Sequence, residues 1–61
     1  MKTETIHGKV THRWTWLLGR FKIGERTVQT GNFVRVMILR EAKWAKVKIY
    51  GNELIELVDV K

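Results

Sequence analysis

Short runs of alternating apolar and polar residues, separated by glycines, constrain the fold of this chain more than any other feature. In Lys9–Leu18 the apolar residues, two tryptophans among them, fall mainly on one side and polar residues mainly on the other. After Gly19 the alternation changes phase, which puts Phe21 and Ile23 on one face. A period of two residues is typical of strands that are buried on one side. A glycine at a phase change indicates a bulge or a sharp bend.

Other segments follow the same pattern, and we expect most of the chain to form strands. Further strands are predicted at Thr3–His7, Phe33–Arg40, Trp44–Tyr50 and Glu53–Val60, with a short strand or loop over residues 24–32. Gly51-Asn52 is a two-residue hairpin signal. In the simplest register Glu56 falls on the core face, which a bulge or an edge position would relieve. With 61 residues, the sequence predicts one domain, residues 1–61. Its expected fold is all-β, a small five-stranded barrel or rolled antiparallel sheet of SH3-like or, alternatively, OB-like type.

The segments 33–40 and 44–50 also predict a functional surface. Their apolar residues agree on one face if Val34 pairs with Ile49 and Val36 with Val47. The opposite face then carries aromatic residues and cations together, with Arg35 directly across from Lys48. Such a like-charge pair is destabilising unless an anion covers it. Bases stack on aromatic rings and cations neutralise phosphates, so we expect this face to bind nucleic acid. The candidate binding residues are Phe33, Arg35, Arg40, Lys43, Trp44, Lys46, Lys48 and Tyr50.

The charge distribution supports a polyanionic partner. Twelve Lys and Arg residues oppose six acids, for a net charge of +6. Residues 5–50 hold ten of the cations and two of the acids, whereas residues 51–61 hold three acids and one lysine. A strong positive field favours RNA or DNA, either free or within a ribonucleoprotein assembly. The chain contains no apolar run long enough to cross a membrane and no signal-peptide pattern. We therefore expect a cytoplasmic protein without a membrane partner.

Two alternatives compete with this interpretation. Ile38, Ala42, Ala45 and Ile49 have helical spacing, so a short helix within this region would dissolve the cross-strand surface and leave Lys43 and Lys46 as a helix-face patch. A protein-interaction module is the other alternative. In that case an apolar face with Leu39, Trp44, Ile55 and Leu57 would dock a partner or a second copy of the chain.

The sequence offers little for catalysis or for a metal. It contains neither Cys nor Ser, and Asp59 is its one aspartate. His7 and His12 fall on opposite faces of a continuous strand, so a metal site is not expected. We predict no enzymatic activity and no cofactor. Trp14 and Trp16 share a face with apolar neighbours and are expected in the core.

Size, charge, tryptophan content and strand number together resemble those of a known group of proteins. In these features the whole chain resembles the small, basic, Cys-free β-barrel proteins of archaeal chromatin and ribosomes. The lean, charged composition, without Pro or Ser, is also typical of heat-adapted proteins. The resemblance implies a nucleic-acid partner. Exposed aromatic residues favour RNA or single strands over duplex DNA, because their bases are open to stacking.

Overall fold

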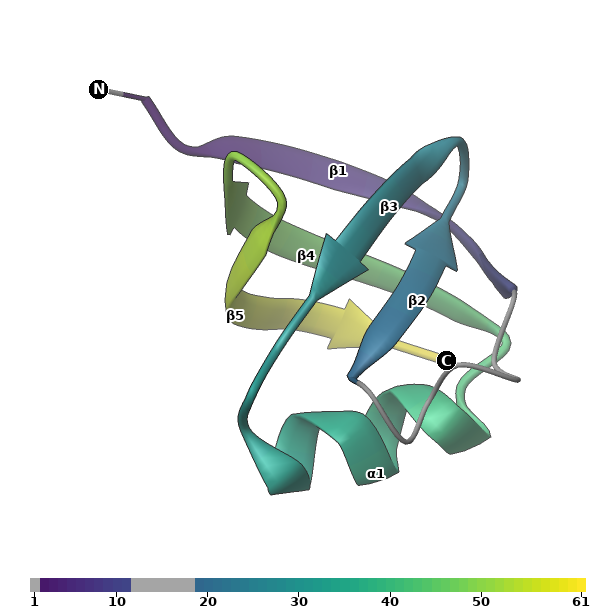
Figure 1. Ribbon diagram of the computed structural model, residues 1–61. Coiled ribbons are helices and arrows are strands. Elements are labelled where there is room, and N and C mark those ends of the chain that lie inside the picture. The colour runs from purple at the N-terminus through teal and green to yellow at the C-terminus, as the bar shows by residue number, and fades with distance from the viewer. Residues whose placement is uncertain (1, 12–18) are drawn as a thin grey trace.

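The computed structural model describes residues 2–11 and 19–61, in which five strands close into a barrel and one helix covers its lower end (Figure 1). In chain order the elements are β1 (Glu4–Thr11), β2 (Arg20–Ile23), β3 (Arg26–Gln29), α1 (Phe33–Glu41), β4 (Trp44–Tyr50) and β5 (Glu53–Val60). Around the barrel the order is β1-β2-β3-β5-β4, and β3 pairs with β5 in parallel. The prediction of a small, five-stranded all-β barrel is confirmed. This order, with the helix between β3 and β4, follows the OB-like one of the two predicted barrel types.

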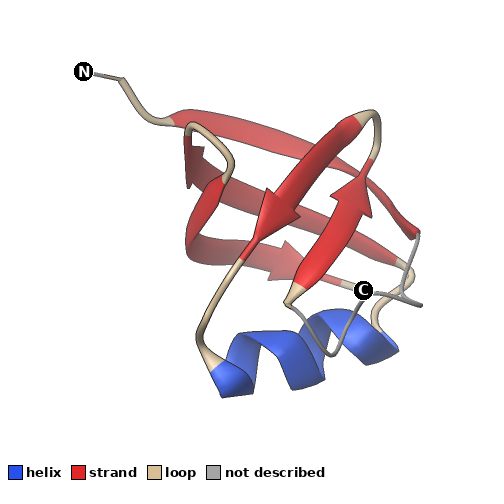
Figure 2. Ribbon diagram, viewed as in Figure 1, coloured by secondary structure: helices blue, strands red, loops and turns tan. Residues whose placement is uncertain are grey.

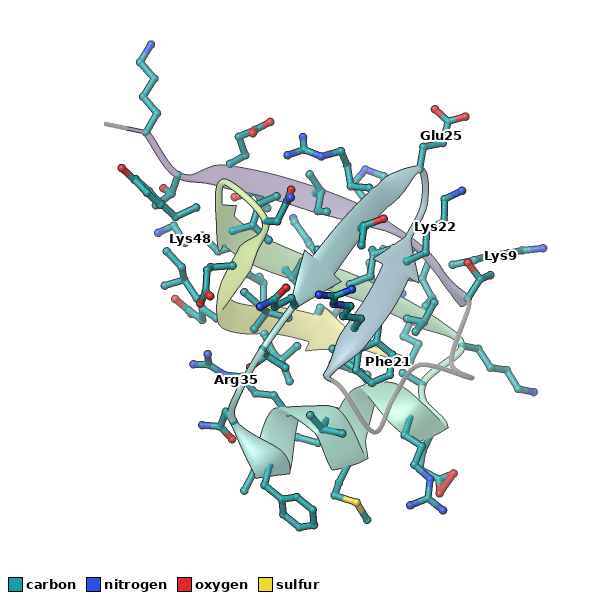
Figure 3. The ribbon with its side chains drawn as sticks, in the orientation of Figure 1. Lys9, Phe21, Lys22, Glu25, Arg35 and Lys48 are labelled. Carbon is teal, nitrogen blue, oxygen red and sulfur yellow. The ribbon has the colours of Figure 1, made fainter. Side chains whose placement is uncertain are left out.

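The core is built from the inward-facing side of the strands and one side of the helix. Its buried apolar residues are Val10, Phe21, Ile23, Val28, Val36, Leu39, Ala42, Ala45, Val47, Ile49 and Leu54. Phe21 and Ile23 share this interior, as their alternation predicts, and Figure 3 shows Phe21 pointing into it. The bend predicted at Gly19 is also present, with φ at +71°. Any Cβ there would collide with the carbonyl oxygen of Thr30.

The strand predicted at Phe33–Arg40 is wrong, because this segment forms the helix α1 (Figure 2). Asn32 caps the helix: its side-chain Oδ1 accepts hydrogen bonds from the backbone N–H groups of Val34 (2.9 Å) and Arg35 (3.2 Å). These bonds satisfy donors that the first turn of a helix leaves open. The short helix considered within residues 40–48 is not formed either, since α1 ends at Glu41 and β4 begins at Trp44.

Strands β4 and β5 form the predicted hairpin around Gly51-Asn52, with Tyr50 paired to Glu53. The register shifts twice along the pair, so that Glu56 lies opposite Lys48 on the outer side. Of the two alternatives expected to move Glu56 off the core face, the bulge is the one that the structure shows. At the two shifts Ile55 and Val58 fall between paired positions of β5, and both side chains are exposed.

The first strand joins two segments that the sequence suggested were separate. β1 runs continuously from Glu4 to Thr11 through Gly8, and the remainder of the strand predicted at Lys9–Leu18 lies outside the described residues. The expected core positions of Trp14 and Trp16 and the placement of His12 fall in that same part. Within the described residues, no helix has the length and hydropathy that crossing a membrane requires.

At the other end of the barrel from α1, an ion pair ties β1 to β3. The guanidinium of Arg26 donates to both carboxylate oxygens of Glu4, at 3.0 and 3.3 Å, and also to the carbonyl oxygen of Gly51 at 3.3 Å. Hydrogen bonding and charge attraction from Arg26 hold the pKa of Glu4 below its usual value. The contact joins three segments at the open end, although both partners are exposed to solvent.

Candidate nucleic-acid interface

The single face predicted from the sequence is not formed, because its two halves belong to different elements. Phe33 and Arg35 lie on α1, whereas Lys48 and Tyr50 lie on β4. The cross-strand partners of Lys48 are Thr5 and Glu56, so the predicted Arg35–Lys48 pair is wrong. The Arg35 guanidinium instead donates to the carbonyl oxygen of Leu54 at 3.1 Å.

The other predicted residues are also divided between elements. Arg40 lies in the last turn of α1, where its Nη1 is 3.7 Å from the Sδ of Met37. Lys43 lies between α1 and β4 and is exposed. Trp44 and Lys46 lie on the outer side of β4. Lys43, Trp44 and Lys46 therefore lie at or just before the start of β4, whereas Phe33 and Arg35 lie in the first turn of α1.

The apolar docking face considered as an alternative is not assembled either. Leu39 is fully buried in the core, and Leu57 is half-buried against it. Ile55 is exposed on β5, where the register shift places it. These residues therefore do not form one exposed surface with Trp44.

A different cluster forms on the outer side of β1 and β4. The register pairs His7 with Lys46 and Lys9 with Trp44, and all four residues alternate with inward-facing neighbours. Directly paired residues have Cβ atoms about 4.5–5.5 Å apart, so two adjacent pairs make one contiguous surface. Lys61, which follows β5, joins them above Trp44. We call these five residues, His7, Lys9, Trp44, Lys46 and Lys61, the basic patch.

Backbone hydrogen bonds hold Lys61 at this place. Its carbonyl oxygen accepts from the N–H groups of Lys43 (2.8 Å) and Trp44 (3.2 Å), and its own N–H donates to the Trp44 carbonyl (2.9 Å). The Lys61 Nζ consequently lies 4.9 Å from the centroid of the Trp44 ring, which is cation–π distance. The His7 ring lies 6.0 Å from the same ring, tilted by 40°. Trp44 is half-buried between these neighbours and the barrel wall.

The patch concentrates positive charge around an aromatic ring. Three lysine ammonium groups and one imidazole surround Trp44, and the nearest acid in the register is Asp59, across from Lys46. The Oδ1 of Asp59 accepts the N–H of Val60 at 2.9 Å. Like charges held side by side are unfavourable until an anion lies between them. The patch can thus bind phosphate groups and offer the ring of Trp44 to a base.

One further cation, Lys22, continues this surface onto β2. Lys22 pairs with Thr11 on one side and Thr27 on the other, so both of its cross-strand neighbours are neutral. Figure 3 shows Lys9 and Lys22 extending from neighbouring strands on the same side of the barrel. Lys48, in contrast, lies across from Glu56. The cross-strand partners therefore distinguish the β1–β2 side, where cations face neutral residues, from the β4–β5 side, where they face acids.

Sequence reasoning found part of this patch and missed the rest. Trp44 and Lys46 were predicted, whereas His7, Lys9 and Lys61 were not. The positions of His7 and Lys9 on the outer side of β1 follow from the alternation of that segment. The position of Lys61 depends on the two register shifts of β5, which the sequence does not specify.

Comparison with known proteins finds no matching family model, no matching curated protein and no matching solved structure. In residues 2–11 and 19–61, no group of three or more acidic or histidine side chains is placed to hold a metal ion. The geometry and charge of the basic patch are therefore the features of this protein that bear on its function.

Proposed function

We propose that this protein binds nucleic acid through the basic patch, with RNA and single strands favoured over duplex DNA. The observation that carries the proposal is the pairing of His7 with Lys46 and of Lys9 with Trp44 on one outer face. Phosphates would lie between the ammonium groups of Lys9, Lys46 and Lys61, where they relieve the repulsion among these cations.

The aromatic ring is the reason for favouring single strands. A base can stack on Trp44 only if it is not already stacked in a duplex. In the free protein the ammonium of Lys61 lies over the ring, and a bound base would take that place while Lys61 moves to a phosphate. OB-like barrels bind oligonucleotides on the face of their second and third strands and on adjoining loops. The basic patch lies on β1 and β4, so its own residues support the proposal and the fold does not.

Titration of a fluorescently labelled single-stranded RNA at several salt concentrations tests the proposal. The test variant is Lys9→Gln with Lys46→Gln, and the matched control is Lys2→Gln with Arg40→Gln. Each double variant lowers the net charge from +6 to +4, since two cations are removed. The control cations are exposed and lie outside the basic patch.

The salt dependence of affinity separates a local site from a general charge effect. Each phosphate contact to a single strand contributes about 0.7 to the slope of log affinity against log salt. Loss of two contacts should lower the slope by about 1.4 in the patch variant, with a much smaller change in the control. Equal slopes and equal affinities in the two variants would show that the basic patch is not the binding site. The same titration with duplex DNA should give weaker binding.

A further inference from the structure

The outer face of α1 exposes more apolar surface than a nine-residue helix normally shows to water. Its exposed fractions are 71% for Phe33, 63% for Val34, 38% for Met37 and 40% for Ile38. The residues one turn apart, 33 with 37 and 34 with 38, form two adjacent rows. Val36 and Leu39 face the opposite way into the core. Contiguous exposed apolar patches mark interaction sites.

We propose that this face binds the same face of a second copy of the chain, as an antiparallel helix pair centred on Met37. The helix lies at one end of the barrel (Figure 2), and its exposed residues lie opposite Val36 and Leu39, which are buried in the core. A second copy can therefore approach it directly. In this arrangement Met37 meets Met37 of the second copy, and residues near the start of one helix meet those near the end of the other.

Charge complementarity selects a second copy in this orientation. None of the residues in the first turn of α1 is acidic, although the start of a helix favours a negative charge. The antiparallel pairing brings Glu41 of one copy to the start of the other helix, where it supplies that charge. Arg40 lies on the same side of the helix as Phe33, and Met37 lies between the two in the same row. Across the pair, its guanidinium reaches the exposed ring of Phe33 in the second copy.

The size of the face predicts a weak, concentration-dependent dimer. Nine residues make a helix about 14 Å long, and stable interfaces bury about 800 Å² on each partner. Four side chains on so short a helix supply only part of that area. The net charge of +6 on each copy also opposes association. Added salt should therefore strengthen the dimer, opposite to its effect on nucleic-acid binding.

Disulfide trapping tests both the occupant and the orientation, because the natural chain has no cysteine. Met37→Cys should form a disulfide-linked dimer readily under mild oxidation. Phe33→Cys should not, since the two copies of residue 33 would be separated by about 12 Å along the helix axis, beyond the Cα distance of about 7 Å that a disulfide can span. Val58→Cys, on exposed β5, is the control for random collision.

Sedimentation of the natural chain gives the second measurement. We expect a monomer–dimer equilibrium that shifts to dimer at higher protein and salt concentration. Met37→Lys should leave only monomer, because the two introduced ammonium groups would face one another. Val58→Lys, which adds the same charge elsewhere, should sediment as the natural chain does. Equal trapping at positions 37 and 58, or a natural chain that stays monomeric at its highest attainable concentration, overturns the proposal and leaves the face to a different protein. Neither result bears on the salt slopes of RNA binding.

Discussion

Replacement of Trp44 separates the role of an aromatic ring from that of its position in the barrel. We predict that Trp44→Leu weakens binding to single-stranded RNA and that Trp44→Phe retains most of it. Stacking of one base is worth about 1–3 kcal/mol, so loss of the ring should lower affinity between about 5-fold and 150-fold. Phenylalanine keeps a stacking face, although a smaller one.

The same substitution should leave the barrel folded. Trp44→Leu removes a cation–π contact with Lys61 and a tilted ring contact with His7. These are worth about 0.5–1 and about 0.5–1.5 kcal/mol respectively. A chain of 61 residues has a free energy of unfolding of about 3–9 kcal/mol. The loss is thus a fraction of the total, and urea unfolding should show a single transition with a lower midpoint.

Fluorescence anisotropy with a labelled single-stranded RNA, combined with urea unfolding of each variant, measures both effects. Full affinity in Trp44→Leu, at unchanged salt dependence, would refute stacking on this ring. Equal losses in the leucine and phenylalanine variants would mean that Trp44 only supports the wall of the barrel.

Three further changes test the fold that positions the patch. Asn32→Ala should lower the free energy of unfolding by about 0.5–2 kcal/mol, because α1 loses two capping hydrogen bonds; an unchanged urea midpoint would contradict the cap. Arg26 lowers the pKa of Glu4. The ion pair therefore stabilises the barrel at pH values above 4.5, the usual pKa of this carboxyl, and the stabilisation is lost as the pH falls through the lowered pKa. Melting temperatures in the acid range should therefore depend less on pH in Glu4→Gln and in Arg26→Gln, and an identical pH profile in all three proteins would argue against the pair. Gly19→Ala combines left-handed backbone strain of about 1–2 kcal/mol with a backbone collision and should unfold much more readily. Gly31→Ala meets no atom within 4 Å and should change little; similar unfolding curves for the two glycine variants would contradict the tight turn.

The alternation of apolar and polar residues was enough to predict the strands that bury one face. Phe21 and Ile23 on β2, and Ala45, Val47 and Ile49 on β4, all point into the core. These predictions succeed because burial on one side forces a period of two, whatever the strands pair with.

The helix α1 was predicted to be a strand, and the error has a physical reason. Val34, Val36 and Ile38 alternate as they would in a strand, and they are β-branched, which favours strands. The helix is apolar on both its buried and its exposed sides, so the contrast that marks a surface helix is weak. The signal that was available is Asn32, a favoured capping residue directly before the apolar run.

The candidate site was predicted only where local pattern determines it. Trp44 and Lys46 belong to a strand whose outer side follows from its own alternation. Which residues flank a lysine on that side depends on the neighbouring strands: Lys46 lies between His7 and Asp59, and Lys48 lies between Thr5 and Glu56. Long-range pairing and register shifts decide these neighbours, and one sequence does not determine either.

Mapping of bound RNA by nuclear magnetic resonance tests the central claim most directly. Titration of the isotope-labelled protein with a short single-stranded RNA should produce the largest chemical-shift changes at His7, Lys9, Lys46 and the indole N–H of Trp44. Binding that shifts α1 or the outer side of β5 while these signals stay in place would contradict the account.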